Sequence, residues 1–106
     1  MSRDRIERGD IWIVDLGLAQ KVRPVLVLSI AYLDNERAVV SYVPRTTSIR
    51  NTRFEVTHRA VGFQEGVFDA QGIGTVPTVK LARYLGKVNA DVLAKVEDAI
   101  RNWLLL

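Results

Sequence analysis

The sequence contains no cysteine and only one histidine, His58. Without cysteine the chain has neither a disulfide framework nor a thiolate nucleophile, and this usage is typical of a reducing cytoplasm. One histidine is too few for a multi-histidine zinc site, or for two histidines that act as acid and base within one chain. Any catalysis by this chain must therefore depend on other side chains.

Long apolar runs are also missing. No stretch approaches the ~20 apolar residues that a membrane-spanning helix requires, and the opening MSRDRIERGD alternates in charge and lacks the apolar segment of a signal peptide. We therefore expect a soluble, cytoplasmic protein with no membrane partner. Its 106 residues suffice for one hydrophobic core but are too few for two domains, so we expect a single domain over residues 1–106.

Basic residues outnumber acidic ones by a small margin. Fifteen Lys and Arg against twelve Asp and Glu give a net charge of +3, which is common among proteins with no acidic partner. The excess is local, because residues 37–59 contain five arginines and one acid, Glu55, whereas residues 89–106 are nearly balanced. Such a local excess suits an acidic partner such as nucleic acid.

Short segments rich in β-branched and aromatic residues, each bounded by Gly, Pro, Asn or Asp, predict a mainly β protein. We expect five strands, and a sixth is indicated at Glu65–Ala70. Pro77 has no N–H to donate, so it either confines the last strand to a sheet edge or breaks it in two. The five expected strands are Asp10–Asp15, Val25–Ser29, Ala38–Val43, Arg53–Thr57 and Gly74–Leu81.

The C-terminal segment is predicted to form an amphipathic helix from about Ala90 to Leu104. Its apolar residues recur at steps of three and four, Asn89 is a suitable N-cap, and Asp91 lies in the first turn, where the helix dipole favours an acid. The apolar stripe is expected to cover one face of the sheet, with a dimer interface as the alternative place for Trp103–Leu106.

Two stretches hold the candidate functional residues, KVRPVLVLS (21–29) and YVPRTTSIRNTRFEV (42–56). Because a proline disfavours helical backbone in the residue before it, Arg23 is expected to be extended. If the two strands in these stretches are antiparallel neighbours, Arg23 and Thr46 share one rim of the sheet. The same rim is predicted to gather Gln20, Lys21, Arg23, Arg45, Thr46, Thr47, Ser48, Arg50 and Arg53.

The predicted rim is rich in hydrogen-bond donors and poor in carboxylates. Hydroxyl and guanidinium groups bind phosphate oxygens, so a polyanionic backbone is the natural ligand. The simpler interpretation is that Thr46, Thr47 and Ser48 are turn residues and that the arginines keep a loop solvated. Spacing alone favours the simpler interpretation, because no catalytic motif of known mechanism is matched.

The remaining titratable residues give weaker indications. In the alternation of a strand, His58 shares a face with Phe54 and Val56, which favours a place in the core over a role as general base. Carboxylates at predicted strand ends look the same as caps and turn residues. None of them stands out from the sequence: Asp15, Glu65 and Asp69.

Three motifs in order, RGDIWIVDL, RPVLVLS and VPRTTSIRNTRFEV, resemble the MazF/PemK family of toxins from bacterial toxin-antitoxin systems. The resemblance begins at Arg8 and continues more loosely through GVFDAQGIGTVPTVKLARYLGKV and the final helix, so it covers nearly the whole chain. It implies a compact, strongly bent antiparallel sheet like an SH3-like barrel, with helices packed outside, and usually a homodimer.

The resemblance also implies an activity. Family members typically cleave single-stranded RNA at specific sequences, which inhibits translation and growth. They use no metal ion or other cofactor and leave a 2′,3′-cyclic phosphate and a 5′-hydroxyl. The arginine of the family's RP motif falls on Arg23, and the first threonine after its VP pair falls on Thr46, so both are implied to be catalytic. The other rim residues are expected to bind RNA, and a small acidic, partly disordered antitoxin is the expected partner.

The sequence departs from the family's pattern in two places. Many members carry a Glu in a longer loop before the RP arginine, whereas here Gln20 is the nearest polar residue, and Pro77 and Thr78 stand where many have a DQ pair. The identity of the general base therefore stays open. The alternatives to a nuclease are a non-catalytic toxin of the same fold that binds a protein such as DNA gyrase, and a nucleic-acid-binding module without turnover.

Overall fold

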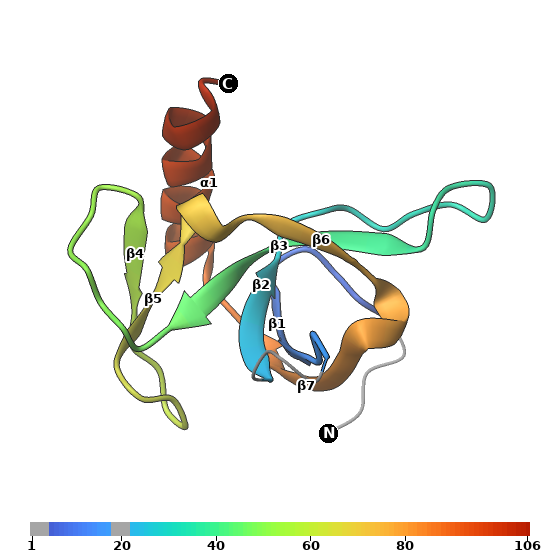
Figure 1. Ribbon diagram of the computed structural model, residues 1–106, viewed down its shortest axis with the longest axis horizontal. Coiled ribbons are helices and arrows are strands. Elements are labelled where there is room, and N and C mark those ends of the chain that lie inside the picture. The colour runs from blue at the N-terminus through green and yellow to red at the C-terminus, as the bar shows by residue number, and fades with distance from the viewer. Residues whose placement is uncertain (1–4, 18–21) are drawn as a thin grey trace.

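The structure is a computed structural model that describes residues 5–17 and 22–106 (Figure 1). Within these residues the chain forms a 7-stranded sheet, two short 3₁₀ turns and one α-helix, α1. All the strand pairs are antiparallel. The predicted mainly β fold with a C-terminal helix is therefore confirmed.

The central strands place the two motif stretches side by side. Strands β1 (Asp10–Val14), β2 (Arg23–Val27) and β3 (Val39–Thr46) are consecutive neighbours in the sheet. Residue 12 lies opposite residue 25, and residue 25 lies opposite residue 44. The expected antiparallel pairing of the second and third strands is confirmed, and the start of β2 therefore lies beside the end of β3.

Strand β3 also joins the two halves of the sheet. One of its edges pairs with β2, and the other pairs first with β6 (Gly74–Pro77) and then with β5 (Gly66–Asp69). Strand β4 (Glu55–His58) pairs with β5, and β7 (Leu81–Lys87) pairs with β1. The sheet is strongly bent (Figure 1). Strands β1, β2, β6 and β7 curl into a ring, and β4 and β5 extend away from this ring to lie beside α1.

The two faces of the bent sheet build two hydrophobic cores. Alternation along β2 sends Val25 and Val27 into the core inside the ring and sends Leu26 into the core that faces α1. All three side chains are 0% exposed. Burial on both faces explains why β2 is an unbroken apolar run rather than an alternating one.

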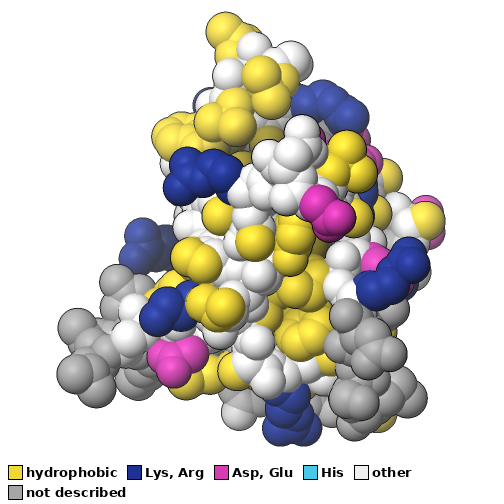
Figure 2. Space-filling model, turned by 90° about the vertical axis from the view of Figure 1, so that its right-hand side faces the viewer, with side chains coloured by type: hydrophobic (Ala, Val, Ile, Leu, Met, Phe, Trp, Pro, Cys, Tyr) yellow, Lys and Arg dark blue, Asp and Glu magenta, His cyan; other side chains and the backbone are white. Residues whose placement is uncertain are grey.

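Helix α1 (Ala90–Leu104) has the bounds that its periodicity predicts. Its N-cap Asn89 accepts a hydrogen bond from the Val92 N–H at 2.9 Å. Val96 and Ala99 are buried against the sheet, as expected, whereas the side chains of residues 103–106 are 42–93% exposed. Hydrophobic side chains accordingly gather at the top of the molecule, where α1 ends (Figure 2). No helix in residues 5–17 or 22–106 has the length and apolar character needed to span a membrane.

The largest departure from the predicted elements follows Pro77. This residue ends β6 and so breaks the predicted strand, a 3₁₀ turn (η2, Thr78–Lys80) comes next, and the chain then forms β7. The sequence did not predict β7. Its residues are half-exposed or exposed, and its register against β1 shifts twice, so it has neither the alternation nor the apolar run that marks a strand.

Candidate active site

Arg23 is the first residue of β2, which begins two residues earlier than predicted. It pairs with Val14 of β1, and Pro24 pairs with Ile13. Its backbone is therefore extended, as the following proline predicts, and the sheet holds it in place. The side chain is exposed and forms no ion pair within the described part of the chain.

Thr46 is the last residue of β3, which extends three residues beyond its predicted end. The register that sets Val25 opposite Pro44 sets Arg23 beside Thr46 when it is continued for two residues. Both residues line two adjoining hollows of about 290 and 250 Å³. This is the rim at which antiparallel pairing places them.

The two hollows together are called the rim site below. The first combines a guanidinium with hydroxyl groups, and the second adds a further arginine and two carboxylates. The first hollow is lined by Val22, Arg23, Pro24, Arg45, Thr46, Thr47 and Ser48. The second is lined by Arg23, Pro44, Thr46, Ser48, Arg50, Glu55 and Asp69.

The Thr46 side chain has a structural contact and a spare donor. Its Oγ1 accepts a hydrogen bond from the Ser48 N–H at 3.0 Å, so Thr46 forms the turn that the simpler interpretation predicts. A hydroxyl that accepts such a bond still has its own hydrogen to donate. The turn therefore fixes the position of the oxygen without using up its ability to bind an anion.

Glu55 and Asp69 contradict the prediction of a rim that is poor in carboxylates. They lie opposite each other on β4 and β5 and line the second hollow together with Arg23. The Glu55 carboxylate accepts hydrogen bonds from the backbone N–H groups of Arg50 and Thr52 at 3.1 Å and so closes the loop before β4. The sequence did not predict these two carboxylates at the rim, because their place there depends on the pairing of β4 with β5, and no local sequence pattern indicates that pairing.

Arg45 lines the first hollow, but its guanidinium is directed into the protein, which does not favour the predicted contact with RNA. Its side chain neighbours Thr46 in sequence and therefore points to the opposite face of β3. Arg45 is 5% exposed, its Nε donates to His58 Nδ1 at 2.8 Å, and its Nη2 donates to the carbonyl oxygens of His58, at 3.0 Å, and of Gln64. Burial lowers the pKa of the Arg45 guanidinium. Its hydrogen bonds hold the β4–β5 connection.

His58 lies in the core, as the alternation of its strand predicts. The ring is 6% exposed and lies 5.2 Å from the ring of Phe63 and 4.9 Å from that of Phe68, measured between centroids. Burial, and then the charge of Arg45, lower the pKa of His58. Since Nδ1 accepts the hydrogen bond from Arg45, the neutral ring carries its proton on Nε2.

A comparison with protein families matches residues 7–104 to the PemK-like, MazF-like toxins of type II toxin-antitoxin systems. The chain belongs to this family. An endoribonuclease from Mycobacterial species, solved in complex with its cognate antitoxin, has 27% sequence identity and a TM-score of 0.84, over 96% of this chain and 97% of that one. No match was found among curated proteins.

Two other solved structures show the same likeness to this MazF-like toxin. The Mycobacterium tuberculosis toxin MazF-mt6 has 30% identity and a TM-score of 0.79, over 92% of this chain and 97% of that one. A MazE–MazF crystal structure from Deinococcus radiodurans has 27% identity and a TM-score of 0.79, over 93% of this chain and 94% of that one. These likenesses extend over nearly the whole chain.

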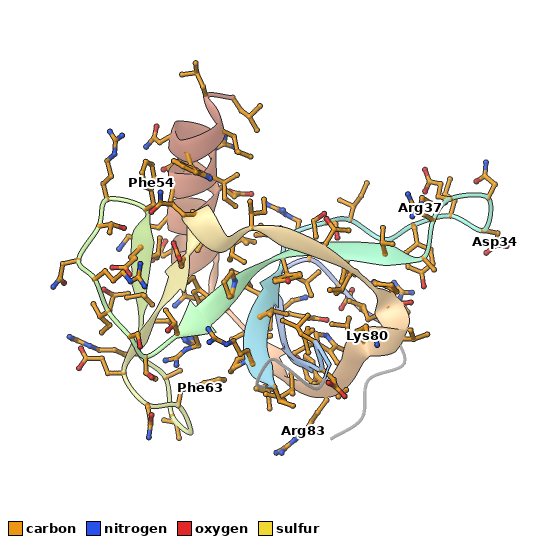
Figure 3. All side chains as sticks on the ribbon, viewed as in Figure 1. Asp34, Arg37, Phe54, Phe63, Lys80 and Arg83 are labelled. Atoms are coloured by element: carbon orange, nitrogen blue, oxygen red, sulfur yellow. The ribbon has the colours of Figure 1, made fainter. Side chains whose placement is uncertain are left out.

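The other predicted site residues of the toxin are only partly gathered at the rim site. Thr47, Ser48 and Arg50 line it. Arg53 does not, because its guanidinium stacks 4.6 Å from the ring centroid of Phe54, which lies beside α1 (Figure 3). The remaining two predicted residues, Gln20 and Lys21, lie outside the described residues.

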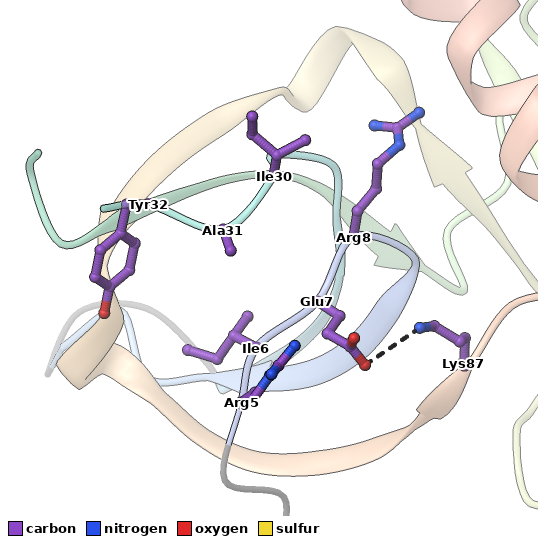
Figure 4. Close-up of a pocket in the computed structure, with 8 residues that line it drawn as sticks. All are labelled: Arg5, Ile6, Glu7, Arg8, Ile30, Ala31, Tyr32 and Lys87. Carbon is purple, nitrogen blue, oxygen red and sulfur yellow. Dashed lines mark ion pairs between the residues drawn. The ribbon is translucent and has the colours of Figure 1, made fainter. Parts of the chain in front are cut away.

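A further hollow of about 470 Å³ lies at the N-terminal end of the described chain and has a different character (Figure 4). Its Glu7 and Lys87 form an ion pair at 3.6 Å, and Arg8 pairs with Glu97 of α1. Most of its charges are therefore paired with one another. The hollow also contains none of the predicted site residues, so the rim site is the better candidate. Its lining comprises Arg5, Ile6, Glu7, Arg8, Ile30, Ala31, Tyr32 and Lys87.

Metal ligation is not suggested by the arrangement of the side chains. Within residues 5–17 and 22–106, no three His, Cys, Asp or Glu side chains come together in a group that could hold a metal ion. The chemistry available at the rim site is instead that of the Arg23 and Arg50 guanidinium groups, three hydroxyls and a pair of carboxylates.

Proposed function

We propose that this toxin is a sequence-specific endoribonuclease that cleaves single-stranded RNA, including mRNA, without a metal ion. The observation that carries the proposal is the meeting of Arg23 and Thr46 in both hollows of the rim site. The likeness in fold to an endoribonuclease over 96% of this chain supports it.

In the proposed reaction the 2′-hydroxyl of a ribose attacks the adjacent phosphorus, and negative charge accumulates on the non-bridging oxygens. The planar guanidinium of Arg23 meets two of these oxygens, and the Thr46 hydroxyl donates one further hydrogen bond. Donors fixed in advance commonly supply the largest catalytic contribution. Pairing with Val14 of β1 and with Val67 of β5 holds the backbones of Arg23 and Thr46 in place here. The products are a 2′,3′-cyclic phosphate and a 5′-hydroxyl.

The neighbouring residues are proposed to align the RNA. Thr47 and Ser48 offer hydroxyls in the first hollow, and the exposed Arg50 offers a cation in the second. Contacts of this kind go to phosphate and sugar, so they position the strand without reading its sequence. Gln20 and Lys21 stay predicted contacts, and Arg53 is expected to meet RNA only beyond the rim site.

The partners follow from the same surface. We propose a small acidic, partly disordered antitoxin that covers the rim site and competes with RNA for Arg23. The negative charge of the antitoxin would repel RNA, and the bound antitoxin would fill the space that RNA needs. Several relatives of known structure are complexes with antitoxin. We also propose a homodimer, in which the exposed side chains of residues 103–106 are covered.

Incubation of the purified toxin with a long RNA in EDTA tests the proposal. Discrete fragments with 2′,3′-cyclic phosphate and 5′-hydroxyl ends are expected, and primer extension on a defined transcript then gives the recognition sequence. Arg23→Ala, purified in the same way, is the control for a contaminating nuclease. If the parent yields no fragments, the endoribonuclease proposal is wrong, and a toxin that acts by binding a protein takes its place.

A further inference from the structure

The proposed reaction needs a group that takes the proton of the attacking 2′-hydroxyl. Arg23 is permanently charged and Thr46 is a hydroxyl, so both serve as donors. His58 is the only histidine, but its ring is 6% exposed and its Nδ1 already accepts a hydrogen bond from Arg45. The base must therefore be sought among the carboxylates of the rim site.

Two carboxylates line the hollow that contains both Arg23 and Thr46, and one of them is fully engaged. Both oxygens of Glu55 accept a hydrogen bond from the Arg50 N–H, and Oε1 accepts another from the Thr52 N–H. Drawing Glu55 toward a substrate would cost these bonds and open the loop of residues 50–55. Glu55 is better explained as the support of that loop.

Asp69 is engaged through one oxygen only. Its Oδ1 accepts a hydrogen bond from the Gln71 N–H at 3.0 Å, whereas Oδ2 has no hydrogen-bond partner among the described residues. Oδ2 lies next to Gly72, where a Cβ would stand 3.7 Å from Oδ2 and only 2.7 Å from Cγ of Pro44. Because residue 72 is a glycine, no side chain of that residue stands beside Oδ2.

We propose that Asp69 is the general base of the toxin and that Oδ2 accepts the proton of the 2′-hydroxyl. This inference rests on the proposed function. It places base and donors in one hollow but on different strands, with Asp69 at the end of β5, Thr46 at the end of β3 and Arg23 at the start of β2. The phosphate then lies between the carboxylate that takes the proton and the donors that receive the developing charge.

The step balances without a further reactant. The 2′-oxygen gives its proton to Asp69 Oδ2 and forms a bond to phosphorus, while the bond between phosphorus and the 5′-oxygen breaks and its electron pair stays on that oxygen. The 5′-oxygen takes a proton from water, and the hydroxide formed is neutralised by the proton that Asp69 then releases. The diester is converted to a cyclic phosphate and an alcohol with no net consumption of water.

The charges around Asp69 suit an anionic substrate. Arg23 from β2 and Arg50 from the β3–β4 loop line the same hollow, and Glu55 faces Asp69 from β4. Two cations thus offset two anions before RNA arrives. A phosphate entering this hollow meets no net negative charge, although a carboxylate lies within it.

Asp69→Asn is the decisive variant, because the asparagine Oδ1 still accepts the Gln71 N–H and so preserves the local turn. Its single-turnover rate at saturating protein should fall by about 10²–10³-fold, a typical loss for a general base. Affinity for an RNA with a 2′-deoxy sugar at the cleavage position should stay the same or increase. Asp98→Asn, the same change at an exposed site on α1, should cleave at the parental rate.

The pH profile separates a base from a structural residue. The dependence on pH that the base gives to the parent rate should persist in the slow Arg23→Lys protein and should be lost in the slow Asp69→Asn protein. An Asp69→Asn protein that cleaves at the parental rate, or that loses rate, RNA affinity and thermal stability together, overturns the assignment of Asp69 while the endoribonuclease proposal stands. A parent protein that does not cleave RNA removes both.

Discussion

Lowering the pH below about 6.5 is expected to destabilise this protein through His58. In the folded state the ring is buried and accepts a hydrogen bond from the Arg45 guanidinium. Burial, and then the positive charge of Arg45, lower the pKa of His58 below its ordinary value of about 6.5. The fold therefore favours the neutral ring, and unfolding lets the ring take up a proton.

The magnitude follows from proton linkage. Above about pH 6.5 the ring is neutral in both states, so the contribution of His58 to stability is complete. As the pH falls from there to the lowered folded-state pKa, unfolding takes up one proton, and the free energy of unfolding falls by about 1.4 kcal/mol for each pH unit. The chain has no cysteine and no second histidine, so His58 is the only side chain whose ordinary pKa lies close to this window.

Urea unfolding at pH 7.5 and 5.5, followed by the fluorescence of Trp12 and Trp103, measures the effect. The comparison variant is His58→Gln, whose amide oxygen accepts the Arg45 hydrogen bond but does not titrate. The variant should be less stable than the parent at pH 7.5, and its stability should change much less between the two pH values. Equal losses of stability in parent and variant would refute the account of His58.

Four further predictions concern the rim site, the arginine beneath it and the end of the helix. Arg23→Lys keeps the charge but loses the two-pronged geometry of the guanidinium. Single-turnover cleavage of a defined RNA should therefore slow by about 10²–10³-fold, with little loss of RNA affinity. Cleavage at the parental rate would show that Arg23 has no part in the chemistry. Arg45→Ala removes hydrogen bonds to His58 and Gln64 and should lower the free energy of unfolding by about 3 kcal/mol in urea titrations. Arg50→Ala should instead leave the free energy of unfolding unchanged and weaken RNA binding in a salt-dependent way. A loss of stability in Arg50→Ala together with a loss of RNA binding in Arg45→Ala would contradict the roles given to these two arginines. Light scattering at micromolar concentration should report a dimer, and a monomer would contradict the role proposed for residues 103–106.

The parts of the fold that bury apolar side chains with a regular period were predictable from the sequence. Helix α1 has its predicted bounds because its stripe, its N-cap Asn89 and its first-turn acid all agree. Strand β7 was not predicted, because an edge strand with shifted register buries too few side chains to leave a pattern. Its pairing with β1 depends on the closure of the ring, which is a non-local property of the chain.

The candidate site also has a part that the sequence predicts and a part that it does not. Arg23 and Thr46 could be brought together from the sequence, because consecutive antiparallel strands place the start of one beside the end of the next. The inward direction of Arg45 could not, since its partners His58 and Gln64 belong to a different strand and loop. Asp69 was visible as a carboxylate at a strand end, but only the pairing of β5 with β3 and β4 brings it to the rim site.

The position of Arg23 and Thr46 within paired strands has a consequence for control of the protein. Arg23 is paired with Val14 of β1 and Thr46 with Val67 of β5, and paired strands resist local opening more than loops and chain termini do. The two donors are therefore less suited to control by a local order–disorder change than residues of a loop would be. The proposed antitoxin, as a separate molecule in the hollow, would restrain the protein without such a change, and the timing of action would then follow the synthesis and degradation of that occupant.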